Sequence, residues 1–151
     1  MTNTSGDDCW FCADDRGADA PPGGWVYEDA HWRAGHSPAK FGPAGLVILE
    51  SRRHVLDVSE LDPDEAAGYG VVLGLLTGAV REVTGAPRVY TWASAAHSPH
   101  LHVWVLPWTA GRPVGPAYLA RTHAFACTGP EAEDAAGALR AALAARAGQR
   151  L

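Results

Sequence analysis

The sequence feature that most constrains the fold is the segment 97–107, in which histidines stand two residues apart inside an apolar run. Across 100–106 the residue types alternate, and valine and tryptophan favour an extended strand. Because residues two apart share a face of a strand, His100, His102 and Trp104 are expected on one side and apolar residues on the other. Histidine titrates near neutral pH, binds metals and can act as a nucleophile. A half-buried strand with hydrogen-bonded histidines fits the pattern equally well.

Length and charge limit the class of protein. The chain has 151 residues, which predicts one domain with a sizeable core. Its formal net charge of −5 argues against a general nucleic-acid binder and leaves room for a small phosphorylated ligand. No apolar run approaches the roughly 20 residues of a membrane span. Residues 1–8 are polar and acidic, unlike a signal peptide, so we expect a cytoplasmic protein and a disordered tail there.

The cysteines suggest metal binding more than disulfide formation. Cys9, Cys12 and Cys127 are odd in number, which argues against a disulfide framework. The two-residue spacing between Cys9 and Cys12 is half of a zinc site, and a redox pair or chance are its alternatives. A redox pair is expected between a strand and a helix, whereas here a loop rich in Gly, Asp and Pro follows over 14–24. Metal is the favoured interpretation.

Periodicity and capping signals give the order of elements. We expect strands at 25–28, 31–36, 45–50, 88–94 and 100–106, a helix ending near Val83, a loop at 111–116 and a terminal helix at 130–147. Asp62, followed by Pro63 and by Glu65 three positions on, predicts a capped start for the central helix. These elements predict an α+β fold, with a single domain over 9–151 and a helical C-terminal extension over about 109–151.

Several motifs, in this order, resemble the histidine triad (HIT) superfamily. They are Val26-Tyr-Glu-Asp, Arg53-His54-Val, Ser59-Glu-Leu with the capped helix, and His100-Leu-His102-Val-Trp104-Val-Leu-Pro107. The cysteine pair before the first strand is similar to that of the zinc-containing bacterial branch and of galactose-1-phosphate uridylyltransferases. The resemblance covers about two thirds of the chain. It implies a HIT-like fold, an antiparallel sheet of about five strands with one long central helix and a C-terminal helix.

The resemblance implies a metal site. Carried over residue by residue, the ligands are Cys9, Cys12, His54 and His100. Two thiolates and two imidazoles form a closed tetrahedral set, which suits structural Zn²⁺. For His54, an exposed position beside two arginines is the alternative.

The resemblance also implies a catalytic residue. His102 matches the family nucleophile, which attacks the α-phosphate of a nucleotide substrate and forms a nucleotidyl-histidine intermediate. Trp104 stands where hydrolases carry a third histidine and transferases a glutamine, and tryptophan cannot act as a general acid. His97, Ser98, Trp104 and His36 are candidates for phosphate or nucleotide binding, although His97 could simply point to solvent.

Three functions remain open at this point. The first is a HIT-type hydrolase or nucleotidyl transferase acting through His102. The second is a nucleotide-binding protein without turnover, and the third is a nucleotidyltransferase of the sugar-phosphate type. A nucleotide or a dinucleoside polyphosphate is the expected small-molecule partner. Many HIT relatives are homodimers, so a homodimer is expected from the resemblance alone.

Overall fold

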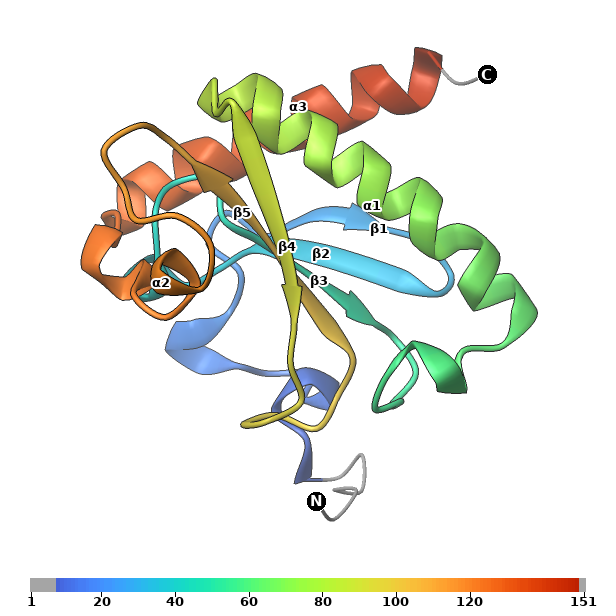
Figure 1. Cartoon of the computed structure of the whole chain (residues 1–151). Helices are drawn as coiled ribbons and strands as arrows, with labels where there is room; N and C mark the ends of the chain where they lie inside the picture. The colour runs from blue at the N-terminus through green and yellow to red at the C-terminus, as the bar shows by residue number, and fades with distance from the viewer. Residues whose placement is uncertain (1–7, 150–151) are drawn as a thin grey trace.

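The computed structural model describes residues 8–149, whose strands form a five-stranded antiparallel sheet (Figure 1). The strands are β1 (Trp25–Glu28), β2 (Trp32–His36), β3 (Val47–Ser51), β4 (Arg88–Ala93) and β5 (His102–Trp108), in the spatial order β1-β2-β3-β5-β4. This confirms the predicted α+β class with one long central helix and a C-terminal helix. Of the tail predicted over 1–8, residues 1–7 lie outside the described residues.

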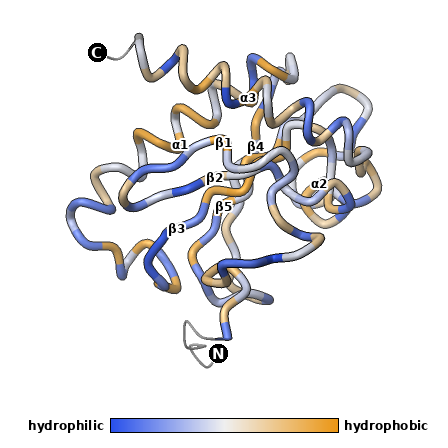
Figure 2. Tube along the Cα trace, turned by 180° about the vertical axis from the view of Figure 1, so that it is seen from behind, coloured by the Kyte–Doolittle hydropathy of each residue, from blue (hydrophilic) through white to orange (hydrophobic). Residues whose placement is uncertain are grey.

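Two long helices lie together on one face of the sheet, α1 (Pro63–Thr84) and α3 (Gly129–Gln149) (Figure 1). Each contacts the other and the strands beneath it. Fully buried apolar side chains such as Leu49, Leu76 and Leu139 fill the space between the helices and the sheet. Along α3 the hydropathy colour alternates (Figure 2), as expected for a helix covered on one side. This face of the sheet therefore forms the main core.

Helix α1 begins and ends as its sequence predicts. The side chain of Asp62 accepts a hydrogen bond from the amide of Glu65, and the Glu65 carboxylate accepts one from the amide of Asp62. Gly85 ends the helix in the left-handed region (φ 69°), which glycine adopts without steric cost. By length and composition, α1 could cross a membrane, contrary to the expectation that no such apolar run exists. Here one side of α1 is packed on the sheet and on α3.

Strand β5 separates the apolar core from the open face of the sheet. Leu101, Val103 and Val105 belong to the core beneath the helices. His102 and Trp104 alternate with them and lie on the opposite face. The strand starts at His102, two residues later than predicted, because the pairing between β5 and β3 extends no further towards the N-terminus than His102. The alternation of side chains nevertheless holds.

The segment between β5 and α3 packs at the end of β5 that lies away from His102. It contains α2 (Pro116–Leu119) and the short 3-10 helix η6 (Thr122–Phe125), neither of which the sequence analysis anticipated. Tyr118 is fully buried, and its hydroxyl donates a hydrogen bond of 2.7 Å to the carbonyl of Pro107. This segment therefore closes a small second core.

Candidate functional site

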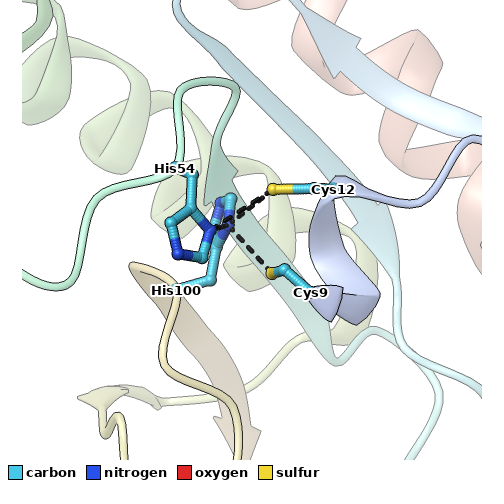
Figure 3. Close-up of side chains that lie close together, drawn as sticks. All are labelled: Cys9, Cys12, His54 and His100. Atoms are coloured by element: carbon cyan, nitrogen blue, oxygen red, sulfur yellow. Dashed lines mark hydrogen bonds between the residues drawn. The ribbon is translucent and has the colours of Figure 1, made fainter. Parts of the chain in front are cut away.

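Four side chains from three separate parts of the chain meet beside β3 (Figure 3). Cys9 precedes the 3-10 helix η2 (Trp10–Cys12) and Cys12 ends it, His54 follows β3, and His100 precedes β5. The Nδ1 atom of His100 lies 3.4 Å from each of the two sulfur atoms and 3.3 Å from Nδ1 of His54. The sulfur of Cys12 is also 3.4 Å from Nδ1 of His54. All four predicted metal ligands are brought together, with their ligand atoms within 4.8 Å of one another.

The spacing of the donor atoms fits a tetrahedral metal centre. Zn–S bonds of about 2.3 Å and Zn–N bonds of about 2.0–2.1 Å separate sulfur from nitrogen by about 3.5 Å and nitrogen from nitrogen by about 3.3 Å. The observed separations are 3.4 Å and 3.3 Å. Two sulfurs and two imidazole nitrogens complete a tetrahedral set, so the residues present fit a structural zinc ion.

Neighbouring groups hold the two histidines in the required orientation. The Nε2 atom of His100 lies 2.7 Å from the carbonyl oxygen of Ser51, so Nε2–H donates and Nδ1 is left with its lone pair. Arg53, next to His54, forms an ion pair of 2.8 Å with the buried carboxylate of Glu65. Because Glu65 also caps α1, this pair fixes the loop that carries His54 to the start of the helix.

The protonation states suit metal binding more than thiol chemistry. Burial, reinforced by the adjacent Cys9 thiol, raises the pKa of the Cys12 thiol to about 11. A thiol with that pKa stays protonated at neutral pH unless a cation displaces its proton. Burial also lowers the pKa of His100, which keeps its imidazole neutral and able to bind a metal. The raised pKa of Cys12 argues against a reactive thiolate at that position.

A buried charged cluster attaches the N-terminal segment to the sheet. Glu50, on β3, accepts hydrogen bonds from Arg16 (3.0 Å) and from Arg33 (2.7 Å). Both guanidinium groups also donate to the carbonyl oxygen of Phe11, at 2.7 and 2.8 Å. The ring of Phe11 thereby stacks on His102, with centroids 4.4 Å apart and planes 25° apart. The sequence analysis did not identify this cluster.

His102 has the properties of a neutral nucleophile. Its Nδ1 atom lies 2.7 Å from the carbonyl oxygen of His100, so Nδ1–H donates and the lone pair is on Nε2. Burial lowers the pKa of His102 below its ordinary value, which keeps the ring unprotonated at neutral pH. A neutral imidazole whose other nitrogen is held by an acceptor is suited to attack an electrophilic phosphorus atom.

His102 lies in the wall of a cavity of about 500 Å³ on the open face of the sheet. Among the predicted site residues, His97, Ser98, His102 and Trp104 all line it. The other lining side chains are mainly aromatic or small, and they are Trp10, Phe11, Asp19, Phe41, Ile48, Trp92, Ser94 and Ala96. The volume is within the range of small-molecule sites.

His36 is not among the residues that line this cavity. It is fully buried at the end of β2. Its Nδ1 atom lies 2.7 Å from the carbonyl oxygen of Ser37, and its Nε2 accepts a hydrogen bond of 2.8 Å from the amide of Gly45. Both ring nitrogens are therefore used to hold the β2–β3 connection, which favours a structural role.

Most of the aromatic lining was missed at the sequence level, although two signals pointed to it. Trp10 and Phe11 lie between the two cysteines, so the placement of both cysteines next to His100 brings these two residues close to the histidine strand. Trp92 pairs with Trp104 across β4 and β5 and so shares its face. Phe41, in the 3-10 helix η4 (Ala39–Phe41), gave no such signal, because its position depends on the β2–β3 connection.

Comparison with known proteins supports the fold. No protein-family model and no curated protein matches the sequence. A zinc-bound histidine triad family protein from Mycobacterium smegmatis is similar in structure, with a TM-score of 0.69, 24% identity, and coverage of 96% of this chain and 99% of that one. A histidine triad protein from Sinorhizobium meliloti is similar with a TM-score of 0.65 and 21% identity. The match covers 80% of this chain and 87% of that one.

A third similar structure is a uridylyltransferase, with a TM-score of 0.59 and 20% identity. The match covers 80% of this chain and 41% of the uridylyltransferase. This chain therefore has the fold of the histidine triad proteins. Within that fold it carries the cysteine–histidine cluster described above.

Proposed function

We propose that this chain is a nucleotide-binding protein of histidine triad type that transfers a nucleotidyl group through His102. The observation that carries the proposal is the arrangement of His102, a partly buried imidazole whose Nδ1–H is held by a carbonyl and whose ring stands in the wall of the cavity. That arrangement leaves Nε2 as the reactive atom.

The proposed reaction has two displacements at the α-phosphorus. The Nε2 lone pair forms a bond to phosphorus, and the bond from phosphorus to the leaving group breaks with its electron pair going to the leaving group. Water then attacks phosphorus and releases its proton to solvent, the P–N bond breaks with its electron pair returning to Nε2, and the nucleoside monophosphate leaves. The carbonyl of His100 accepts the Nδ1–H bond throughout, which stabilises positive charge on the ring in the intermediate.

In this proposal the Cys2His2 cluster holds a structural zinc ion. A closed four-ligand set leaves no coordination position for substrate, so the metal would have a structural role. Because two of its ligands lie in the N-terminal segment, it would tie that segment to the sheet. The aromatic rings between the cysteines would then be fixed beside His102. We assign phosphate or nucleotide contact to His97, Ser98 and Trp104, which line the cavity.

Two alternatives rest on specific residues. Trp104 offers one N–H donor and no titratable proton, which favours a nucleotide-binding protein without efficient turnover. The run Pro99-His100-Leu-His102 favours a nucleotidyltransferase that uses a phosphorylated acceptor, such as a sugar phosphate, in place of water. The absence of a glutamine at position 104 counts against this second alternative.

We also propose that the protein forms a homodimer. Strand β4 is an edge strand of the sheet, and its unpaired backbone groups could pair with a second copy. Trp92, on this strand, and Val71, on α1, are large apolar side chains left exposed. Sedimentation or light scattering should give twice the chain mass, and a monomer at micromolar concentration would contradict the proposal.

The test is turnover of a panel comprising a dinucleoside tetraphosphate, a nucleoside phosphoramidate, and a nucleotide sugar with and without added phosphate. Wild type and His102→Ala are compared, and we expect the variant to lose at least about 1000-fold in rate, since it lacks the nucleophile. Equal melting temperature and metal content in the two proteins control for folding. Binding without product in wild type would favour the non-catalytic alternative, and product only with an added acceptor would favour the transferase.

A further inference from the structure

An aromatic wall stands beside His102 on the open face of the sheet. The ring of Trp104, two residues along β5, neighbours the rings of Trp92 and Phe41, with centroids 6.1 Å and 6.3 Å away. Both pairs are tilted by just over 50°, so the rings do not cover one another's faces. Trp92 and Phe41 are 38% and 37% exposed. We name Phe41, Trp92 and Trp104 the aromatic wall.

The cavity has almost no positive charge to offer. Among the described residues, none of those that line it is arginine or lysine, and one, Asp19, is acidic. The lysine nearest in the chain to the wall, Lys40, forms an ion pair of 2.9 Å with Asp19. Arg16 and Arg33 are directed at Glu50 and at the Phe11 carbonyl. A long polyphosphate chain would therefore find little compensation for its charge here.

The residue that follows His102 on this face of β5 cannot protonate a basic leaving group. Trp104 follows His102 on the same face of β5, and an indole N–H does not titrate in water. His97 lines the cavity from an exposed loop. A leaving group that departs as a stable anion needs no such proton, since a carboxylic acid with a pKa of about 4 is ionised at neutral pH.

From these three observations we infer that the substrate is a nucleoside monophosphate joined through one phosphate to an aromatic acid, whose ring packs on the aromatic wall. The inference rests on the proposed function and specifies its leaving group. Nε2 of His102 forms the bond to phosphorus, the bond from phosphorus to the acid's oxygen breaks, and the acid leaves as an anion with that electron pair. Trp92 and Phe41 are thus specificity-determining residues.

The test uses two mixed anhydrides of adenosine monophosphate, one with benzoic acid and one with cyclohexanecarboxylic acid. Both acids leave without a proton and have similar size, so the comparison isolates the aromatic ring. We expect wild type to prefer the benzoyl compound about 3- to 10-fold in kcat/KM, in line with the strength of aromatic pairs. Trp92→Leu should bring the ratio close to one, and Trp92→Phe should restore it.

Trp108→Leu is the matched control, because Trp108 lies on the same sheet but does not line the cavity. It should leave the preference for the benzoyl compound intact. A ratio near one in wild type, or the same ratio in wild type and Trp92→Leu, would overturn the inference. So would a higher kcat/KM for a dinucleoside tetraphosphate than for the benzoyl anhydride.

Binding separates this inference from the proposed chemistry. Adenosine acylsulfamates that carry the same benzoyl or cyclohexanecarbonyl group cannot transfer a nucleotidyl group, and their Kd values are measured on wild type and on His102→Ala. Tighter binding of the benzoyl compound to both proteins, without turnover of either anhydride, would refute the reaction and uphold the aromatic preference. Equal Kd values would refute the preference even if both anhydrides are hydrolysed.

Discussion

The two faces of the sheet are built from the same strands but are assembled in different ways. On the covered face, α1 and α3 supply apolar side chains that meet those of β3 and β5. On the open face, the same strands present Glu50, His102 and Trp104, and the layer over them comes from the N-terminal segment. The covered face is held by apolar burial, whereas the open face is held by the ion cluster around Glu50 and by the cysteine–histidine cluster.

This difference shows how one alternating strand can serve both packing and chemistry. Burial on the covered face needs only side chains of suitable size and polarity. The open face needs defined donors at defined distances, because a buried carboxylate such as Glu50 is stable only when paired. We therefore expect substitutions on the two faces to have effects of different kinds.

The largest effect on stability is expected from the metal cluster. Cys12→Ser, or removal of metal with a chelator, should lower the melting temperature by about 10 °C or more, because a structural zinc contributes several kcal/mol and each corresponds to about 2–4 °C in a domain of this size. Cys127→Ser is the matched control, since Cys127 lies outside the cluster. Purified protein with no bound zinc and with chelator-independent melting would show that the open face is held without metal.

On the covered face, Leu76→Ala should reduce the free energy of unfolding by about 2–5 kcal/mol, because a fully buried side chain leaves a cavity. Denaturant unfolding measures this loss. Val71→Ala, on an exposed position of the same helix, should change it by less than about 0.5 kcal/mol. Metal content should be the same in both variants. Loss of zinc from Leu76→Ala would mean that the two faces are coupled more strongly than their contacts suggest.

The Glu65–Arg53 pair links the faces and gives a smaller, pH-dependent effect. Its hydrogen bonds, first of all those from Arg53, lower the pKa of Glu65 from 4.5 to about 2. Because the folded state binds this proton less readily, the stabilisation is present above pH 4.5 and is lost as the pH falls towards 2. Glu65→Gln should therefore cost about 1–3 kcal/mol at pH 7 and progressively less below pH 4.5. A constant difference between the two proteins across this range would contradict the assignment.

The smallest effect is expected from the exposed loop. His97→Ala should raise KM about 2- to 10-fold and leave kcat unchanged, because losing one hydrogen bond to a phosphate weakens substrate binding by about that factor. Steady-state kinetics on the benzoyl anhydride would measure it. A large fall in kcat would instead make His97 a proton donor, and the leaving group would then not need to be a stable anion.

The covered face could be predicted from sequence because its signals are local. The alternation in β5, the capping residues Asp62 and Glu65, and the continuous apolar run of β3 each specify an element from a few neighbouring residues. The alternation also placed His102 and Trp104 on one face. Predicted boundaries differ from those observed mainly where a strand partner ends, as at His100.

The open face could be predicted only in part. The resemblance to histidine triad proteins implied the four ligands Cys9, Cys12, His54 and His100, and the structure brings all four side chains together. The pairing of Glu50 with Arg16 and Arg33 joins residues far apart in the chain, so no local pattern indicates it. His36 is a candidate for nucleotide binding in the sequence because it lies on an early strand, where the resemblance places the nucleoside pocket. Only tertiary structure shows that its ring nitrogens face backbone groups.

The most direct test of the central claim is to look for the covalent intermediate on His102. Wild type and His102→Ala are mixed with a substrate from the panel and quenched at alkaline pH, because a P–N bond is labile in acid, and their intact masses are then measured. The account predicts that wild type alone gains the mass of one nucleotidyl group and that peptide mapping places it on His102. Product formation without such an adduct, or the same adduct on His102→Ala, would contradict it.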